Sequence, residues 1–437
     1  MSEPWQTDRL GKFCYIKARI GWRGLSASEY TETGPFLIAG KHIESGSIIW
    51  DACDHISEFR FRESSEIALA KGDVIITKDG TIGRVARVDL LPGKATINGT
   101  MMLVRPERGI DYRFLYHVLN GTEFKKLIED KVSGSSIPHI FQRDMVTLPI
   151  SFPSIEYQAK LAQILDTLDT TIHETEAIIA KLKAVKQGLL HDLLTRGIDA
   201  NGELRPPQAE APHLYKESPL GWIPKEWDVK QFAELLSDAD PAMRSGPFGS
   251  ALLKQELVAA GHPFLGIDNV HTERFIAEYR RFVTPKKFAE LSRYAVRSAD
   301  LMITIMGTVG RCCLVPEDVG QALSSKHTWT ITLDQELYSP YLAMLQVNYS
   351  PWVLEHFARD QQGGTMAAIR SETLRSTQLP TPPRGEQRLI EECLREISKR
   401  IDLEVDSFAK RQAEKSGLMD DLLTGRIRVT PLLEDTE

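Results

Sequence analysis

The sequence is poor in cysteine and has no long hydrophobic run. Its 437 residues include five cysteines, Cys14, Cys53, Cys312, Cys313 and Cys393. None of them forms a CxxC pair, and an odd number argues against a secreted disulfide framework. No apolar run approaches the roughly 18 residues that a membrane span needs, and the N-terminus lacks the charged-then-apolar pattern of a signal peptide. We therefore expect a soluble, cytoplasmic protein with reduced thiols.

Recognisable catalytic motifs are also missing. The chain has no GxxxxGK[ST] phosphate loop, no GxGxxG, no HExxH and no Cys/His cluster with zinc spacing. The segment "TPPR" (Thr381–Arg384) lacks the amide or acid, and the aromatic ring, that an adenine methyltransferase loop carries. We interpret it as the turn that opens a helix. The sequence thus predicts a chain that is not an enzyme by itself and holds no metal.

Positive charge is not in excess over the whole chain, because the net charge is −7. A local excess can still bind nucleic acid, since only the contacting face must be positive. One such excess lies in residues 274–297, which contain only two acids, Glu278 and Glu290. The basic residues of this segment are Arg274, Arg280, Arg281, Lys286, Lys287, Arg293 and Arg297. The alternative is that this run is ordinary solvated surface.

What the sequence does contain is a long internal repeat. "DVIITKDGTIGRV" begins at Asp73 and returns as "DLMITIMGTVGRC" at Asp300, an offset of 227 residues. Other paired segments follow in the same order at offsets of 227 to 231, which is the mark of a duplication. They are "GPFLIAG" with "HPFLGID", "FLYHVLN" with "YLAMLQV", "SGSSIPHI" with "QGGTMAAI", the "LP" at Leu148 with the "LP" at Leu379, and "KQGLLHDLLT" with "KSGLMDDLLT". The chain is therefore two copies of one unit.

Each copy ends in a pattern typical of one long helix. Apolar residues recur at alternating spacings of four and three, which is the a/d seam of a coiled coil, and about 40 residues at 1.5 Å each would give a rod of roughly 60 Å. Polar residues interrupt both seams at matching places, Thr175 with Glu404 and Lys186 with Lys415. The predicted seam residues are Leu161, Leu165, Leu168, Ile172, Ile179, Leu182, Leu189 and Leu193 in the first copy, and Ile390, Leu394, Ile397, Ile401, Phe408, Leu418 and Leu422 in the second.

The two seams favour an antiparallel pairing of the long helices with each other. The alternative is that each helix packs independently on its own domain. Pro153 and Pro383 suit the helix starts, and Gly197 and Gly425 suit the C-terminal caps. The part of each copy before its helix has short β-branched runs broken by Gly, Pro, Asn and Asp, which indicates a mixed α+β domain.

These patterns predict the domain organisation. The segment Asp199–Pro219 has four prolines and little apolar content, as a linker does. We expect a first domain at 1–152, a long helix at 153–198, a linker at 199–219, a second domain at 220–382, a second long helix at 383–427 and a tail at 428–437.

The repeated turns "GTIGR" and "GTVGR" allow two interpretations. Two glycines let successive backbone N–H groups point at a phosphate, with a hydroxyl and an arginine beside them. The same glycines are also what a tight turn needs for positive φ. The sequence leaves both open.

The whole set of motifs resembles the specificity subunit of type I restriction–modification enzymes. The resemblance rests on "SPLGWIPKEWDV" at the start of the second half, on the paired "GTIG" and "GTVG" turns, on the segments opening the long helices ("LPISFPSIEYQAKLAQILDTLD" and "LPTPPRGEQRLIEECLREI") and on "LLTRGI" and "LLTGRI" closing them. It covers nearly the whole chain. At the N-terminus "SEPWQTDRLGKFC" keeps only a trace of "GWIPKEW", which leaves the start of the first domain open.

The resemblance implies a function for each part. The two mixed domains would be target recognition domains, each reading one half of a split, asymmetric site in double-stranded DNA. The helices would hold them apart and set the spacer between the half-sites. Two modification subunits, using S-adenosylmethionine, would dock on the helices and methylate a flipped-out adenine. Two restriction subunits, using ATP and Mg, would add translocation and cleavage, so this chain itself would need no cofactor.

Candidate DNA contacts follow from the chemistry of groove and phosphate binding. Arg, Lys, Asn and Gln suit base edges, whereas Ser, Thr and backbone amides suit phosphates. The candidates lie in or beside the glycine turns and the "SGSS" and "QQGGT" segments: Lys78, Thr81, Arg84, Ser133, Ser135, Ser136 and His139 in the first domain, and Arg244, Thr308, Arg311, Lys326, His327, Gln361, Gln362 and Thr365 in the second.

Two other classes of function stay open at the level of sequence. One is a non-catalytic scaffold whose two domains bind proteins at the ends of a coiled-coil stalk; salt-sensitive binding to DNA or heparin would argue against it. The other is a methyltransferase with unrecognisable motifs, which tight binding of S-adenosylmethionine to the isolated chain would support.

Overall fold

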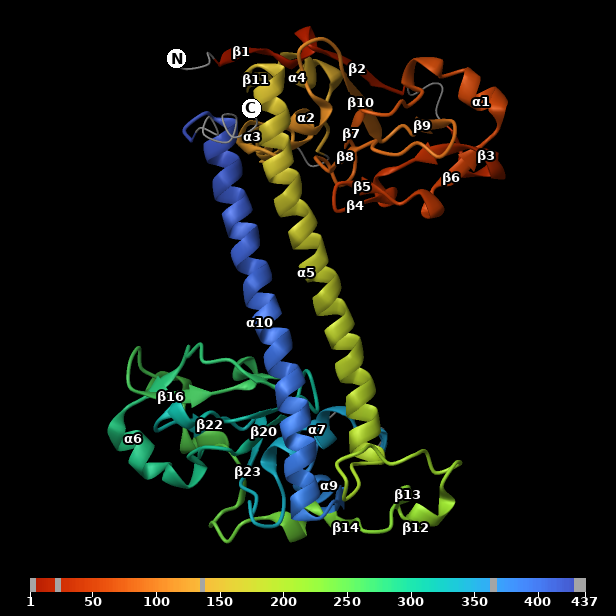
Figure 1. Cartoon of the computed structure of the whole chain (residues 1–437). Coiled ribbons are helices and arrows are strands. Elements are labelled where there is room, and N and C mark those ends of the chain that lie inside the picture. Colours follow the sequence, from red (N-terminus) through yellow and green to blue (C-terminus); the bar gives the residue numbers. More distant parts are fainter. Residues whose placement is uncertain (1–4, 20–24, 134–137, 362–367, 428–437) are drawn as a thin grey trace, which may run out of the picture. The chain divides into compact units, whose positions relative to one another are not determined.

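The computed structural model describes residues 5–19, 25–133, 138–361 and 368–427 (Figure 1). The chain divides into two compact units, Met1–Ile179 with Glu404–Glu437, and Ala180–Leu403. Each unit combines a mixed α+β domain with parts of two long helices, α5 (Ile155–Thr195) and α10 (Arg384–Leu423). Within the described part of the chain, no helix has both the length and the apolar character needed to cross a membrane.

The domain of the first unit is built on a four-stranded antiparallel sheet with strand order β2-β10-β7-β8. Beside it lies a three-stranded sheet, β6-β3-β9, in which β3 and β9 run parallel. The strands are β1 (Gln6–Arg9), β2 (Cys14–Ala18), β3 (Tyr30–Ile38), β4 (Ile43–Glu44), β5 (Ser47–Ile48), β6 (Asp54–Ile56), β7 (Val74–Thr77), β8 (Val85–Arg87), β9 (Ala95–Ile97), β10 (Met101–Pro106) and β11 (Pro149–Phe152). The short helices are α1 (Glu58–Arg62), α2 (Tyr112–Val118), α3 (Thr122–Ser133) and α4 (Gln142–Thr147).

Both faces of the four-stranded sheet are covered, which explains why β7 is a continuous apolar run. Val74 and Ile76 belong to a core shared with α2 and the long helices. Ile75, which points to the opposite face, belongs to a second core shared with the β6-β3-β9 sheet. A strand buried on both faces has no reason to alternate polar with apolar residues.

The domain of the second unit repeats this topology. Its four-stranded sheet has the order β15-β23-β20-β21, and its three-stranded sheet β19-β16-β22 again contains one parallel pair. The strands are β12 (Tyr215–Ser218), β13 (Gly221–Pro224), β14 (Asp228–Gln231), β15 (Met243–Ser245), β16 (His262–Leu265), β17 (Val270–His271), β18 (Arg274–Phe275), β19 (Phe282–Val283), β20 (Leu301–Thr304), β21 (Cys312–Leu314), β22 (Leu323–Ser324), β23 (Thr328–Ile331) and β24 (Gln378–Thr381). The short helices are α6 (Pro285–Glu290), α7 (Pro340–Tyr349), α8 (Pro351–Gln361) and α9 (Ser371–Ser376).

An antiparallel strand pair that precedes each long helix shows where the first copy begins. In the second unit β14, from the "EWDVKQ" segment, pairs antiparallel with β24 just before α10. In the first unit β1 pairs antiparallel with β11 just before α5. The first copy therefore contains the same closing pair, although its sequence keeps only a trace of the entry motif. The predicted repeat and the mixed α+β fold are confirmed.

The two long helices pair antiparallel within each unit, as predicted (Figure 1). In the first unit the early part of α5 shares a core with the late part of α10, through Leu161 and Leu165 on one and Leu422 on the other. In the second unit Leu193 of α5 shares a core with Ile390 and Leu394 of α10. Every predicted apolar seam residue is buried or partly buried.

Hydrogen bonds and ion pairs accommodate the polar residues that interrupt the seam. In the first unit Nη1 of Arg411 donates to Oγ1 of Thr175 at 2.5 Å, and Lys415 pairs with Asp169. In the second unit Lys186 pairs with Glu273 at 2.6 Å. The matching lysines of the two copies thus each have a carboxylate partner in their own unit.

Each helix ends in the way that the glycines predict. Gly197 has φ 64° and its N–H donates to the carbonyl of Asp192 at 3.2 Å. Gly425 has φ 72° and its N–H donates to the carbonyl of Leu422. In this left-handed conformation a side chain would be strained, so glycine is favoured just past a helix.

The segment predicted as a linker is more ordered than a free connection. Arg205 is buried and pairs with Glu386 near the start of α10 at 2.5 Å. Tyr215 is also buried, and it begins β12, which pairs with β13. The prolines and the low apolar content led us to expect a linker, but one buried ion pair and a short hairpin tie the segment to the second unit.

Candidate nucleic-acid interface

The two glycine turns have the same hydrogen bonds in both copies. At the end of β7 the hydroxyl of Thr77 donates to the carbonyl of Thr81 at 2.6 Å and accepts from the N–H of Arg84 at 2.9 Å. The N–H of Gly83 donates to the carbonyl of Thr77 at 2.9 Å. At the end of β20 the same three bonds link Thr304 with Thr308, Arg311 and Gly310.

These bonds favour the tight-turn interpretation over a backbone phosphate site. The N–H groups of Gly83 and Arg84 point inward to the threonine and cannot also bind an anion. Both glycines of the first turn have positive φ, 71° at Gly80 and 84° at Gly83. A Cβ at Gly83 would lie 2.2 Å from the end of the Ile128 side chain in α3, so that side chain would have to move.

The side chains of the turns, rather than their amides, are what a ligand could meet. Thr81 and Arg84 are exposed in the first domain, and Nη1 of Arg84 donates to the carbonyl of Gly40 at 3.3 Å. Thr308 is exposed and Arg311 half-buried in the second. A hydroxyl and a guanidinium at one turn are suited to phosphate oxygens.

In the first domain, two more candidates adjoin the turn. Lys78 pairs with Asp79 at 2.5 Å, and Nδ1 of His139 hydrogen-bonds to the same carboxylate. Burial acts to raise the pKa of Asp79, but the hydrogen bonds from Lys78 and His139 outweigh it, so the pKa lies below its ordinary value. Ser133 is exposed at the end of α3, where its hydroxyl donates to the carbonyl of Glu129. Ser135 and Ser136 lie outside the described residues.

In the second domain, Lys326 and His327 lie beside the turn. The N–H of Ile305, just after β20, donates to the carbonyl of His327 at 2.9 Å. Lys326 is exposed and His327 is half-buried. Burial, and then the charges of Lys326 and Arg281, lower the pKa of His327, so its ring is neutral near pH 7. Gln362 and Thr365, and the side chain of Gln361, lie outside the described residues.

Arg244 is a correction to the predicted DNA contacts. Its side chain is 1% exposed and its guanidinium pairs with Asp300, which is fully buried. Further bonds run from its Nε to the carbonyl of Ala295 at 2.7 Å and from its Nη1 to Oγ1 of Thr332 at 2.9 Å. A guanidinium enclosed in this way cannot reach DNA, so Arg244 is part of the domain core.

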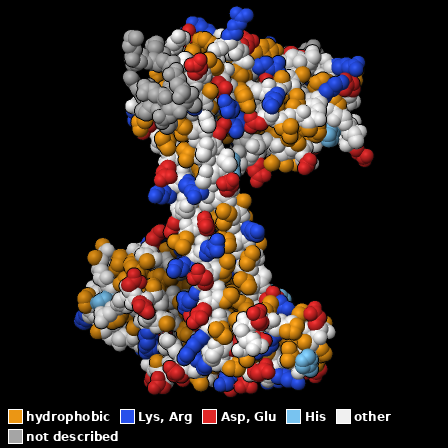
Figure 2. All heavy atoms as spheres, in the orientation of Figure 1, with side chains coloured by type: hydrophobic (Ala, Val, Ile, Leu, Met, Phe, Trp, Pro, Cys, Tyr) orange, Lys and Arg blue, Asp and Glu red, His pale blue; other side chains and the backbone are white. Residues whose placement is uncertain are grey.

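The basic run of the second domain is partly neutralised. Lys287 pairs with Glu256 at 2.7 Å and with Glu290 at 3.2 Å, and Arg281 pairs with Asp268. On the face of each unit seen in Figure 2, Lys and Arg side chains are interspersed with Asp and Glu. Local positive charge therefore belongs to individual side chains and not to one broad basic patch on that face.

Sequence reasoning missed two exposed residues near His139. Phe141 is 44% exposed, and the guanidinium of Arg143 lies 4.6 Å from the centre of its ring. The ring of His139 lies 4.3 Å from the same centre. The signal was present in "HIFQR", where an aromatic residue stands between a histidine and an arginine.

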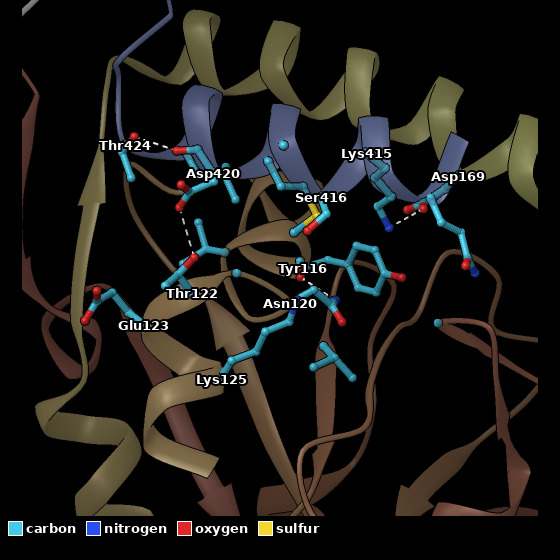
Figure 3. A pocket seen from close by; sticks show the side chains of 18 of the residues that line it. Tyr116, Asn120, Thr122, Glu123, Lys125, Asp169, Lys415, Ser416, Asp420 and Thr424 are labelled. Atoms are coloured by element: carbon cyan, nitrogen blue, oxygen red, sulfur yellow. Dashed lines mark hydrogen bonds and ion pairs between the residues drawn. The ribbon is translucent and has the colours of Figure 1, made fainter. Parts of the chain in front are cut away.

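A pocket of about 1490 Å³ lies in the first unit between the domain and the long helices (Figure 3). Lys415 and Asp169 form an ion pair at one side of it. Asp169 also comes close to His117 and Asp166, so that the three side chains could hold a metal ion by their spacing. Both carboxylates already have cationic partners, however, since Arg87 pairs with Asp166 at 2.5 Å. The charge that a metal ion would supply is thus already present.

Comparison with known proteins supports a single family. A family model described as the type I restriction modification DNA specificity domain matches the chain twice, at residues 2–184 and 224–407. The specificity subunit of the type I restriction enzyme MjaVIII of Methanocaldococcus jannaschii is 23% identical over 438 residues, which cover 98% of this chain and 94% of that one. The putative MjaX specificity subunit of the same organism is 24% identical over 392 residues, with 86% and 83% covered.

Solved structures share the fold. The S subunit of a type I restriction–modification system from M. genitalium has a TM-score of 0.57 at 14% identity, with 96% of each chain covered. A chain from a structure on complex assembly and conformational transition of the type I R-M system has a TM-score of 0.53 at 16% identity, with 97% of this chain and 99% of that one covered. Because one specificity-domain model matches both halves, this chain belongs to the family of type I restriction–modification specificity subunits.

Proposed function

We propose that this chain gives a type I restriction–modification enzyme its DNA sequence specificity, with each domain reading one half of a split, asymmetric site. The observation that carries the proposal is the duplicated domain, which has one topology but different side chains at equivalent turns. Two copies of one framework present the same kind of surface to two half-sites. Different side chains on that framework then read different sequences.

In this proposal the paired helices α5 and α10 determine the spacing between the half-sites. They also offer the docking surface for two modification subunits, which bring S-adenosylmethionine and methylate adenine. Two restriction subunits bring ATP and Mg for translocation and cleavage. The chain itself then contributes binding and positioning and no catalysis, and it acts in the cytoplasm, where the DNA is.

The test is to express this chain together with its modification subunit and to map methylated adenines over the genome. We expect a single split motif that disappears when this chain is deleted. A complex that forms but leaves no methylation would contradict the assignment to an adenine-modifying enzyme. Failure to form any complex would favour a protein-binding scaffold instead.

A further inference from the structure

Phe141 is a large apolar ring held at the surface of the first domain. It is 44% exposed and stands at the N-cap of α4. Its backbone N–H donates to Oδ2 of Asp144 at 2.8 Å, and the same carboxylate oxygen pairs with Lys131 of α3 at 3.0 Å. The backbone under the ring is therefore fixed, although the ring itself faces solvent.

The groups around the ring leave only part of it free. The guanidinium of Arg143 lies 4.6 Å from the ring centre, and Nζ of Lys131 lies 5.8 Å from it. The His139 ring packs at 4.3 Å with an angle of 56° between the planes. A cation over an aromatic ring is attracted by the quadrupole of the ring, so the guanidinium of Arg143 covers part of the ring and helps to hold it in one orientation. The remaining part of the Phe141 side chain, which is 44% exposed, can meet a ligand.

This ring belongs to the same surface as the glycine turn. His139 hydrogen-bonds to Asp79, and the two residues also form an antiparallel backbone bridge. The N–H of Ile140 donates to the carbonyl of Lys78 at 3.0 Å. Phe141 is therefore attached to the end of β7, where the turn that carries Thr81 begins.

We propose that the exposed part of the Phe141 ring contacts the 5-methyl group of a thymine in the half-site that the first domain reads. This inference rests on the proposed function. Thymine is the base with a methyl group in the major groove, and apolar side chains recognise it by contact. Arg143 is exposed, forms no ion pair among the described residues, and can meet a flanking phosphate.

The geometry favours this contact over insertion of the ring between base pairs. A wedge needs free ring faces, because it replaces the stacking that the separated bases lose. Here Arg143 and His139 already lie against the ring. The exposed part of the ring can instead touch a methyl group while the guanidinium of Arg143 stays near a phosphate.

The second domain offers different chemistry at the matching place. Arg370 stands at the N-cap of α9 as Phe141 stands at the N-cap of α4, and it is also exposed. A guanidinium suits guanine or phosphate and gains nothing from a thymine methyl. The proposed contact is therefore specific to one half-site.

The test uses the full chain in complex with its modification subunit and a duplex carrying the motif found by methylation mapping. Burying one methyl group contributes roughly 0.8 kcal/mol, so deoxyuridine in place of the thymines of the first half-site should weaken binding by about fourfold. Phe141→Ala should weaken binding to the unmodified duplex by at least that factor. On the variant, uracil should cause no further loss.

Three controls separate this contact from other causes. Phe59→Ala removes another exposed ring of the same unit, 70% exposed in α1, and should leave affinity unchanged. Uracil in the second half-site should weaken wild type and Phe141→Ala equally. Phe141→Leu keeps an apolar side chain and should retain part of the response to uracil. The thermal unfolding of each variant confirms that it is folded.

The outcomes distinguish this inference from the proposed function. If wild type binds a split motif and Phe141→Ala binds equally well, the contact does not exist. If Phe141→Ala weakens binding but uracil has the same effect on both proteins, the ring acts in another way, such as a wedge, and the methyl contact is wrong. If the wild-type complex has no specific site, the proposed function itself fails.

Discussion

Two arginines of the second domain, both predicted to contact DNA, have different surroundings in the structure. Arg311 follows a glycine turn and stays half-exposed, with its N–H bonded to Thr304 and its side chain available to a ligand. Arg244 follows a proline-containing loop and is enclosed with Asp300 in the core. At the scale of single residues, function therefore depends on whether a charge has a buried partner.

Arg311→Ala should weaken binding to the cognate duplex without unfolding the protein. The loss of one phosphate contact should also lower the salt dependence of binding by about one unit of log K against log salt. Titrations at several salt concentrations measure both effects. Lys410→Ala, on the exposed side of α10, is the control and should change neither. An affinity equal to wild type at fixed salt would remove Arg311 from the contacts.

Arg244→Met should destabilise the second domain without a direct effect on DNA. Burial raises the pKa of Asp300 against the influence of Arg244, and removing the guanidinium leaves that carboxyl buried without its cation. Breaking a buried pair costs about 3–5 kcal/mol, whereas replacing both partners costs much less. Denaturant unfolding should show a large loss for Arg244→Met and a partial recovery for Arg244→Met with Asp300→Asn. Equal stability of Arg244→Met and wild type would contradict the burial.

His117 should make the first unit sensitive to acid. Burial lowers the pKa of His117 below its ordinary value of 6.5, although the hydrogen bond to Asp166 opposes the shift. The unfolded state therefore binds a proton that the folded state does not, and stability is lost as pH falls through and below about 6.5.

His117→Gln retains a donor toward Asp166 but does not titrate. Its unfolding midpoint should therefore fall less steeply than that of wild type between about pH 7 and pH 5. His42 and His327 also have lowered pKa values, so some slope should remain in the variant. Identical slopes in the two proteins would show that His117 does not contribute.

At the scale of secondary-structure elements, the seam combines apolar packing with a few polar contacts. Leu161 and Leu422 supply buried apolar surface, whereas Arg411 reaches across to Thr175 and to the carbonyl of Thr171. Apolar residues pack in several registers at similar cost, but a hydrogen bond across the seam is made in only one. Polar seam residues thus specify register, at some cost in stability.

Arg411→Leu should leave the free energy of unfolding within roughly 1–2 kcal/mol of wild type. It should also let the two helices align in more than one register. Spin labels at Gln163 and Glu414 would report it as a wider distribution of distances. The labelling needs a Cys393→Ser background, because Cys393 is only partly buried while the other cysteines are buried. Lys410→Leu is the matched control and should leave the distribution narrow. A narrow distribution in Arg411→Leu would show that apolar packing alone sets the register.

At the scale of the whole molecule, the proposed function implies that the paired helices α5 and α10 set the length of the DNA spacer between the two half-sites. Inserting one heptad into the middle of both α5 and α10 keeps the seam continuous and lengthens each helix by about 10 Å. One base pair adds about 3.4 Å to the duplex, so the recognised spacer should grow by up to about three base pairs. The half-site sequences should not change.

Mapping methylated adenines in cells that express the lengthened chain measures this directly. An insertion of four residues in only one helix breaks the match between the seams and should abolish methylation. An unchanged spacer in the heptad variant would mean that the helices do not set the distance.

The sequence alone was sufficient for the repeat, the long helices and their caps. The heptad spacing is a local property of the chain, and Gly197 and Gly425 are identified by the conformation that a helix end requires. The duplication is visible because paired segments keep their order. Together these patterns led to the mixed α+β domains and the antiparallel helix pair, and to the family.

Only the tertiary structure decided what individual side chains can do. The amides of the glycine turns bond to Thr77 and Thr304, Arg244 is enclosed with Asp300, and Phe141 stands exposed beside Arg143. Each of these outcomes depends on residues far away in the chain, such as Asp300 for Arg244 and Asp79 for His139. Local patterns determine secondary structure because its period is local, whereas burial and charge pairing arise only when distant segments pack together.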